Sequence, residues 1–312
     1  MRRLLILLAM AVLSCGSTPQ VEEIINGRIL FLGDSITQDG RYVSIIEYEL
    51  LKRYPGVDLI SIGLSSETVS GLTEPNHPYP RPCIHDRLER ALSAIKPKTV
   101  FACYGMNDGI YHPQSEERFQ AYKDGIQKLI DAVRAAGATP ILLTPPTFDP
   151  LPIAHKTVDR SAPLFGYASP FVGYNDVLAE YGKWLLSLQP AVQVIDLNTA
   201  MLHYTRQRRA DDSTFTLAPD GVHPQWVGHA LMAQQVLSAL GVPTAQFDPA
   251  ALATQLENDD LFQRAHQRRQ MRSAAWLVEI GYEMPMTVEA LPVAEAEMRA
   301  AAEKSAIVSA LK

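Results

Sequence analysis

Residues 28–37 read RILFLGDSIT, and the class of fold is decided here. The apolar run that opens this stretch has the length and the β-branched and aromatic content of a buried strand, and it ends at Gly33. Asp34 and Ser35 follow at once, and apolar residues then recur with helical spacing at 42–54. A strand that gives way directly to a helix indicates a βα unit, the building block of parallel sheets.

The same alternation continues along the chain. Further apolar runs of strand length occupy 57–62, 99–104, 139–144 and, more weakly, 192–197, and helical patterns occupy 84–95, 119–136, 175–188 and 224–240. Strands alternating with helices predict a mostly parallel, five-stranded sheet covered by helices on both faces. In such sheets ligands bind at the carboxyl ends of the strands, so the residues just after each run are the candidates for chemistry.

The chain of 312 residues is long enough for one α/β domain, which we place at 25–244, and a C-terminal extension at 245–312. The extension carries helical patterns and no strand signal, and we expect it to pack on the α/β domain or to contact a partner. Its arginines 264, 268, 269 and 272 recur at helical spacing, which predicts a solvated helix face, with contact to anionic lipid as a weaker alternative.

The net charge is −6, so the chain lacks the excess of Lys and Arg that nucleic-acid binding requires, and we expect no nucleic-acid partner.

Arg2 and Arg3 precede an apolar run at 4–13 that is too short to span a bilayer but suits a signal peptide at 1–15. Ser14-Cys15 at its end looks like a bacterial lipobox.

The lipobox predicts a lipidated Cys15, a tether at 16–24 and an exported lipoprotein that is anchored to the membrane, in the periplasm or on the cell surface. Ordinary secretion is the alternative. The other two cysteines, Cys83 and Cys103, lack metal-ligand spacing; export permits a disulfide between them, but Cys103 lies in an apolar run and is expected to be a buried thiol.

Ser35 follows the first strand, where its hydroxyl is exposed at the sheet edge beside the free N–H groups of the next helix. Alone this is weak, because Asp-Ser is also a common helix cap. Gly63 and Asn107 follow the second and third runs. A glycine there can bring a backbone N–H close to a substrate oxygen, and an asparagine can donate its amide, although both also serve ordinary turns.

Late in the domain, residues 219–224 read PDGVHP. Asp220 and His223 are three residues apart on a loop that enters a helix, so the carboxylate can orient an imidazole that removes the serine proton. A third ligand for a metal is missing, and His229 falls within the next helical pattern. We therefore expect neither a metal nor a cofactor. The proline-rich segment 146–174 is predicted to be a long loop that is functional or mobile.

In this order and at these positions, the motifs resemble those of the GDSL/SGNH hydrolase family. Its blocks appear here at 33–37, at Gly63 with Ser65, at 105–108 and at 220–224, so the resemblance spans 28–240. It implies a flavodoxin-like three-layer α/β/α sandwich. The second block departs from the family's Asn-x-Gly-x-Ser-Gly, which leaves the shape of its loop open. The Gly-x-Ser-x-Gly elbow of classical α/β-hydrolases is absent.

The resemblance further implies that Ser35 is the nucleophile, that His223 is the general base and then the general acid, and that Asp220 orients it. The backbone N–H groups of Ser35 and Gly63 and the side chain of Asn107 would form the oxyanion hole.

The resemblance favours an ester as the substrate. The loops after the second and third strands mix polar and aromatic groups that suit a sugar, unless they are ordinary surface residues: Thr73, Glu74, Asn76, His77, Tyr79, Arg81, Tyr111 and His112. We expect removal of acetyl or another short acyl group from carbohydrate. The alternatives are a lipid-directed esterase or lysophospholipase and, in another class, an anchored carbohydrate-binding protein that keeps a hydrolase fold.

Overall fold

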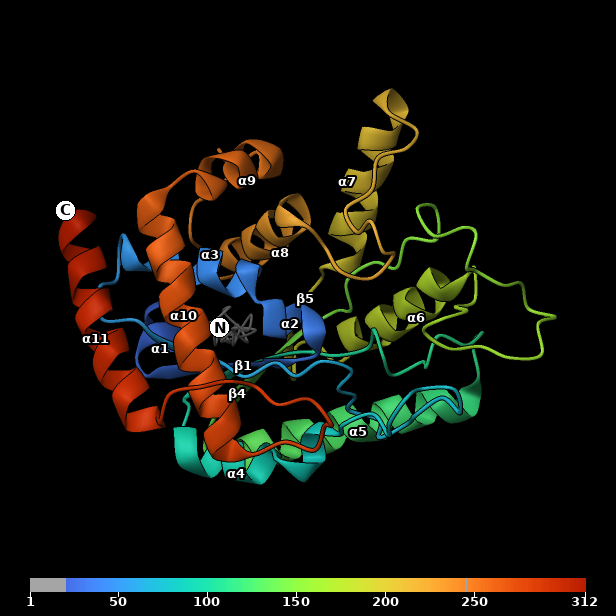
Figure 1. The fold of residues 1–312 in the computed structure, drawn as a ribbon, viewed down its shortest axis with the longest axis horizontal. Coiled ribbons are helices and arrows are strands. Elements are labelled where there is room, and N and C mark those ends of the chain that lie inside the picture. Colours follow the sequence, from blue (N-terminus) through green and yellow to red (C-terminus); the bar gives the residue numbers. More distant parts are fainter. Residues whose placement is uncertain (1–20, 245) are drawn as a thin grey trace, which may run out of the picture.

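The computed structural model describes residues 21–244 and 246–312, and its centre is a parallel sheet (Figure 1). The five strands are β1 (Arg28–Gly33), β2 (Asp58–Ser61), β3 (Thr99–Cys103), β4 (Thr139–Leu143) and β5 (Gln193–Ile195). They are all parallel, in the order β2-β1-β3-β4-β5. The predicted five-stranded α/β sheet is confirmed.

The strand order reverses between β1 and β3: the chain moves from β1 to β2 on one side and then returns to place β3 on the other. In open parallel sheets such a switch point leaves a crevice at the carboxyl ends of the strands, because the connections on its two sides leave in opposite directions. The segments after β1, β2 and β3 therefore meet at one edge. These segments carry Ser35, Gly63 and Asn107.

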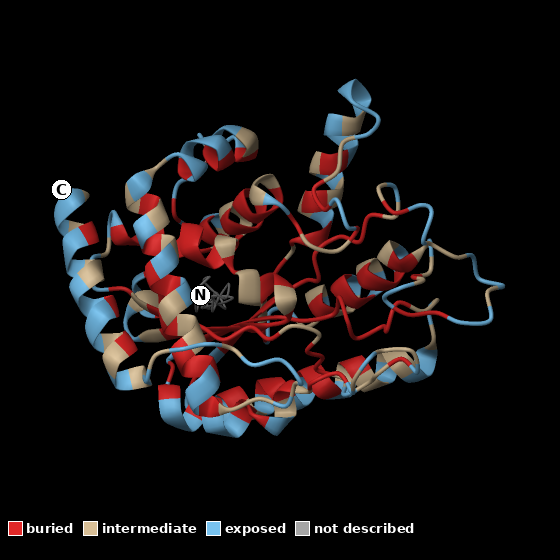
Figure 2. Cartoon of the chain, in the orientation of Figure 1, coloured by how far each residue is buried: buried red, intermediate tan, exposed pale blue. Residues whose placement is uncertain are grey.

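Helices cover both faces of the sheet and make a three-layer sandwich (Figure 1). One face carries α3 (Arg41–Leu51) and α8 (Trp226–Ala239), and the other carries α4 (Leu88–Ile95), after the 3-10 turn η1 (Ile84–Asp86), and α5 (Glu116–Ala135). Next to α5 lies α6 (Tyr174–Leu186), whose Tyr181 stacks on Tyr122. Figure 2 shows the strands and the inward helix faces buried together, as amphipathic periodicity requires.

Two helices of this domain were not predicted. The short α2 (Ser35–Asp39) directly follows β1, and α7 (Asn198–Asp211) projects from the body (Figure 1). Within α7 only Asn198, Met201 and Thr205 are buried, so this helix lacks the apolar stripe by which helices are recognised in sequence.

The described chain begins in α1 (Val21–Ile25), where Val21 and Ile24 are buried. The prediction of a tether at 16–24 is therefore wrong for residues 21–24, because two apolar side chains bury against the core. The rest of that tether, the signal peptide at 1–15 and the lipidation of Cys15 lie outside the described residues. Within those residues, no helix combines the length and apolar character needed to cross a bilayer.

The C-terminal extension consists of α9 (Pro249–Glu257), α10 (Asp260–Ile280) and α11 (Val293–Ala310). It packs on the α/β domain, with α10 against α3 and the edge strand β2, and with α11 on α10. An exposed strand edge is a site of aggregation, so a covering helix protects it.

The predicted solvated arginine face is wrong for three of its four members. Arg268, Arg269 and Arg272 are 5%, 1% and 4% exposed, and their guanidinium groups bind the domain beneath. Arg264 alone is exposed, in an ion pair with Glu303. Helical spacing placed these arginines on one face correctly, but that face meets backbone carbonyls and carboxylates instead of water.

Candidate active site

Ser35 begins α2 immediately after the central strand β1. Asp34 caps this helix, because its carboxylate accepts a hydrogen bond of 2.9 Å from the Ile36 N–H. Both neighbours of Ser35 are buried, whereas Ser35 itself is partly exposed. The strand-to-helix turn thus presents the Ser35 hydroxyl at the carboxyl edge of the sheet.

His223 and Asp220 lie beside that hydroxyl. Ser35 Oγ is 2.8 Å from His223 Nε2, and His223 Nδ1 is 2.6 Å from Asp220 Oδ2. The other carboxylate oxygen of Asp220 accepts hydrogen bonds from the backbone N–H groups of Val222 and His223, at 2.9 and 2.7 Å. The turn at 220–223 therefore holds the carboxylate and the imidazole together, and the fold brings both to a serine 188 residues earlier.

The electrostatics of this pair favour an ionised carboxylate. The hydrogen bond to Asp220 raises the pKa of His223 above its ordinary value, against the opposing effect of burial. Burial works to raise the pKa of Asp220 as well, but the hydrogen bonds from His223 and Val222 prevail and lower it to about 2. Asp220 is therefore negative at neutral pH and stabilises a positive charge on His223.

Gly63 lies against the turn that carries Ser35. The Leu64 N–H donates to the Gly33 carbonyl at 2.9 Å, which extends the pairing of β1 and β2 past Gly63. A Cβ at Gly63 would lie 2.3 Å from Gln38 N and 2.8 Å from the Asp34 carbonyl oxygen, so only glycine fits. Within the described chain, the backbone N–H groups of Ser35 and Gly63 donate no hydrogen bond, which leaves both for a ligand.

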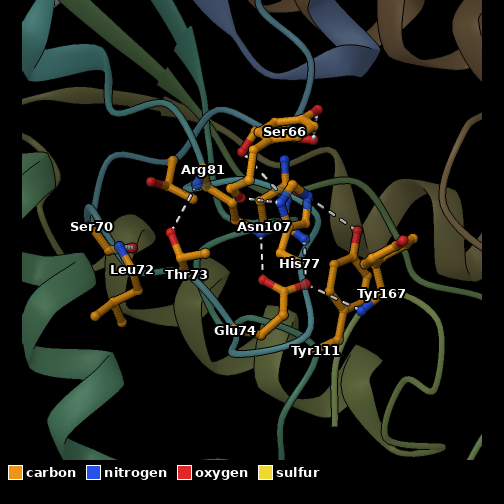
Figure 3. A network of polar contacts seen from close by, with 12 residues as sticks. Ser66, Ser70, Leu72, Thr73, Glu74, His77, Arg81, Asn107, Tyr111 and Tyr167 are labelled. Atoms are coloured by element: carbon orange, nitrogen blue, oxygen red, sulfur yellow. Dashed lines mark hydrogen bonds and ion pairs between the residues drawn. The ribbon is translucent and has the colours of Figure 1, made fainter. Parts of the chain in front are cut away.

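Asn107, just beyond β3, is buried and held at both ends of its amide. Its Nδ2 donates to the Glu67 carbonyl at 3.2 Å. Its Oδ1 accepts from the hydroxyl of Tyr111, which lies beside it in Figure 3, at 3.2 Å. An amide nitrogen carries two hydrogens, so one remains after the bond to Glu67. Ile110 and Tyr111 have φ values of 45° and 60°, left-handed conformations that cost energy and often mark functional sites.

A model of the GDSL-like lipase/acylhydrolase family matches residues 31–231. The chain belongs to this family. The match contains Ser35, Gly63, Asn107, Asp220 and His223, the five residues of the candidate site.

Two solved structures with TM-scores above 0.5 share the fold. A protein from Parabacteroides merdae described as a GDSL-like lipase aligns with a TM-score of 0.51 and 18% identity, over 72% of this chain and 100% of its own. A gut microbial diltiazem-metabolizing enzyme aligns with a TM-score of 0.51 and 21% identity; the match covers 69% of this chain but only 47% of that longer one. An acetylxylan esterase from Geobacillus stearothermophilus aligns with a TM-score of 0.48 and 21% identity, over 73% and 98% of the two chains. A search of curated proteins gave no match.

A buried ion pair that was not predicted from sequence holds the backbone next to Gly63. Arg87 donates to both oxygens of Glu67, at 2.6 and 2.7 Å, and also to the Ile62 carbonyl at 2.7 Å. Glu67 in turn offers its own carbonyl to Asn107. The pair thus connects the backbone before Gly63 with the amide of Asn107. Opposite charges 20 residues apart in loops give no sequence signal of such a contact.

Asp108 joins the loops of the second and third blocks. Its Oδ1 accepts from the backbone N–H groups of Val69 and Ser70, both at 2.8 Å. Together with Glu67 it places negative charge near Asp34. Burial, with a smaller effect of these carboxylates, raises the pKa of Asp34 to about 7. A carboxyl that titrates near neutrality therefore lies directly beside Ser35.

The long loop at 146–174 supports the Asp220 turn. Asp149 is buried; its N–H donates to the Gly221 carbonyl at 2.9 Å, and its Oδ2 accepts from Arg209 and Thr216, both at 2.6 Å. The predicted functional reading of this loop thus has a structural basis: Asp149 holds the backbone between Asp220 and His223. An aspartate in a proline-rich loop reads as an ordinary turn residue, so sequence alone did not identify it.

The polar residues of the loop after β2 divide into a buried group and a partly exposed group. Glu74 and Arg81 form a buried, two-fold hydrogen-bonded ion pair at 2.6 and 2.7 Å, and the Arg81 guanidinium lies 5.6 Å from the Tyr111 ring (Figure 3). Neither is available to a ligand. His77 instead meets the rings of Tyr79 and Tyr167 edge to face, at 4.6 and 5.3 Å, and Tyr167 is 49% exposed.

Among residues 21–244 and 246–312 no group of three or more metal-binding side chains could hold an ion. His229 is buried, which lowers its pKa to about 3, and its Nδ1 accepts from the Tyr42 N–H at 3.3 Å. Cys83 and Cys103 are both free thiols, and Cys103 is buried as expected. These side chains serve the packing of the domain.

Proposed function

We propose that the chain is a serine esterase in which Ser35, His223 and Asp220 act together. The observation that supports this most is the unbroken series of hydrogen bonds from Ser35 Oγ through the His223 ring to Asp220. His223 Nε2 would take the hydroxyl proton as Oγ attacks the ester carbonyl carbon. The same nitrogen would then protonate the departing alkoxide, leaving an acyl group on Ser35. Water activated by His223 would release the acid and restore the serine.

The negative oxygen formed during attack needs donors that are already in place. The free N–H groups of Ser35 and Gly63 and the remaining Nδ2 hydrogen of Asn107 would supply them. Asn107 is suited to this because its bonds to Glu67 and Tyr111 fix the plane of the amide before substrate binds. A donor that is held in advance loses little free energy to reorganisation during the reaction.

Asn107→Ala is expected to lower kcat on p-nitrophenyl acetate by about a hundredfold or more, because one lost oxyanion donor costs roughly 3 kcal/mol in the barrier. The change also removes the partners of Glu67 and Tyr111, so melting temperatures must be measured alongside and activity compared well below them. Asn258→Ala, on an exposed residue after α9, is the control and should match the wild type. An Asn107→Ala enzyme with wild-type kcat would remove Asn107 from the oxyanion hole.

For the substrate, we propose a short acyl ester, most simply acetyl, on carbohydrate. The ring surface of His77, Tyr79 and Tyr167 supports this, because sugars bind on aromatic faces beside polar groups. It contacts the segment that follows Gly63: Tyr79 OH is 3.4 Å from the hydroxyl of Ser66, three residues past Gly63.

A lipid-directed esterase is the second candidate, and one observation favours it. Leu151, Leu164 and Val172 are 46%, 46% and 44% exposed, all on the loop that supports the Asp220 turn. Apolar side chains exposed beside an active site can meet an acyl chain or a lipid surface.

Acyl-chain preference separates the two candidates. We expect kcat/KM on p-nitrophenyl acetate to exceed that on the octanoate by about tenfold or more, because a site for a small acyl group excludes extra methylenes. Acetate release from a set of acetylated polysaccharides would then identify the sugar. A preference for octanoate or longer esters would overturn the carbohydrate proposal. A wild-type protein inactive on every ester, yet able to bind polysaccharide, would instead indicate a binding protein on a hydrolase fold.

A further inference from the structure

A buried arginine of the C-terminal extension contacts the far end of the helix that carries Ser35. Arg269 of α10 is 1% exposed; its Nη2 donates to the Asp39 carbonyl at 2.6 Å, and its Nε donates to the Ser44 hydroxyl at 2.7 Å. Asp39 is the last residue of α2. One side chain therefore joins the end of α2 to α3.

The backbone is shaped to admit this guanidinium. Gly40, between α2 and α3, has a left-handed φ of 62°, and a Cβ there would lie 2.5 Å from Arg269 Nη1. Any other residue would meet both the strain of that conformation and the arginine. The link between the two helices is thus fitted to Arg269.

Helix α10, which carries Arg269, also contacts the segment that carries His223. Trp226, the first residue of α8, lies three residues after His223, and its ring packs on Phe262 and His266 of α10, each with centroids 5.9 Å apart. His266 Nδ1 is 2.9 Å from the Ser44 hydroxyl that Arg269 also binds. Helix α10 therefore contacts the serine segment and the histidine segment at once.

Arg41 connects these contacts to the histidine turn. Its guanidinium pairs with both oxygens of the Asp39 carboxylate at 2.8 Å, lies 5.1 Å from the Trp226 ring, and reaches the carbonyl of Pro224 at 3.5 Å. Pro224 directly follows His223. The residues at 39–41, which Arg269 holds from one side, thus reach the histidine turn on the other.

The hydrogen-bond partners of Arg269 do not compensate fully for the burial of its positive charge. Both hydrogen-bond acceptors are neutral oxygens, and the nearby carboxylates of Asp39 and Glu47 only partly offset the effect of burial, which lowers the pKa of Arg269 to about 10. A buried cation with incomplete pairing stabilises a fold less than an apolar side chain of similar size would. A rigid, planar set of donors has its advantage in fixing geometry.

We propose that Arg269 is a positioning residue, through which the C-terminal extension holds α2 and the histidine segment in register for the reaction. The inference rests on the proposed function of Ser35 and His223. Arg269 touches neither residue and acts through Asp39, Gly40 and Ser44. The extension is then a working part of the active site as well as a cover for β2.

The test compares Arg269→Met with Arg272→Met in the full-length protein. Arg272 is a matched control: it lies on the same helix, is 4% exposed, and donates to a backbone carbonyl, that of Leu59, at 2.8 Å. Its other partners, Asp58 and Glu297, lie at the sheet edge and on α11, away from α2 and α8. Both changes remove buried hydrogen bonds, so both should lower the melting temperature.

We expect Arg269→Met, assayed well below its melting temperature, to lower kcat about ten- to hundredfold with little change in KM, because small misplacements of reacting groups cost this much. Labelling of Ser35 by a fluorophosphonate should slow in parallel. Arg272→Met should keep kcat within about twofold and label at the wild-type rate. Equal kcat for the two variants at matched stability would overturn the proposal.

Arg269→Lys provides the second variant if the methionine variant does not fold. An ammonium keeps the charge and can reach one acceptor, but it cannot present two donors in the fixed plane of a guanidinium. The kcat of Arg269→Lys should fall between those of Arg269→Met and Arg272→Met. A wild-type kcat and labelling rate in Arg269→Lys would contradict the positioning role of Arg269. If Ser35→Ala retained activity, the proposed function would fail first. If Ser35→Ala were inactive while Arg269→Met behaved like Arg272→Met, only the inference about Arg269 would fail.

Discussion

Ser35→Ala is expected to lower kcat on p-nitrophenyl acetate by about 10⁴- to 10⁶-fold, the range found when a nucleophile is removed from a serine triad. The methyl group leaves His223 Nε2 without the hydroxyl that lies 2.8 Å away, so no acyl-enzyme can form. Alanine is smaller and tolerated in helices, and Ser35 is partly exposed, so the fold and its melting temperature should change little.

Ser305→Ala is the matched control, because this serine also lies on a helix, is exposed, and donates only to the Ala301 carbonyl within α11. Its activity should equal that of the wild type. Activity that survives in Ser35→Ala, with an active wild type, would mean that another group attacks the ester. Mass spectrometry after fluorophosphonate treatment should place the adduct on Ser35, and an adduct elsewhere would contradict the assignment.

Asp220→Asn is expected to lower kcat by roughly 10⁴-fold and to move the acidic limb of the pH profile to lower pH. In the proposed mechanism His223 must be neutral to accept the serine proton. Because its hydrogen bond to Asp220 raises its pKa, activity in the wild type should fall away on acidification at a pH above about 6.5, the ordinary histidine value. Without the carboxylate the imidazolium loses its partner, so the limb shifts downward. The lower plateau follows because an amide NH₂ facing Nδ1 favours the wrong tautomer.

The measurement is kcat/KM between pH 4.5 and 9. Asp220 itself, with a pKa of about 2, stays ionised throughout and cannot cause the limb. Asp34 could cause the acidic limb instead, because burial raises its pKa to about 7. Asp34→Asn separates the two groups, since asparagine keeps the cap on α2. A limb that disappears in Asp34→Asn and stays unshifted in Asp220→Asn would show that Asp34, and not His223, controls the profile.

Much of the α/β domain could be predicted from sequence because its signals are local. Each strand is a short apolar run between breakers, and each major helix except α7 carries an apolar stripe of its own. The candidate site followed from the same local signals, since residues just past parallel strands must gather at one edge. Asp149 and the pair of Glu67 and Arg87 could not be predicted, because their partners lie in other loops and no periodicity marks them.

In the C-terminal extension, local signals predicted the helix face correctly but not its burial. Spacing placed Arg268, Arg269 and Arg272 on one face of a helix, and composition then favoured water as the neighbour of that face. Burial depends on what the face meets. Here the face meets the carbonyls of Asp39 and Leu59 and the carboxylates of Glu47 and Asp58, which accept hydrogen bonds from guanidinium groups that sequence composition places in solvent.

The alternation of strands and helices, the turn that exposes Ser35, and the pairing of Asp220 with His223 follow from the sequence, because the signal for each lies in residues that are close along the chain. Two contacts appear only in the tertiary structure: the His223 imidazole lies 2.8 Å from the Ser35 oxygen, and Arg269 of the extension donates to the Asp39 carbonyl at the end of α2. Such contacts join segments up to 230 residues apart, and they form only when whole surfaces pack against one another.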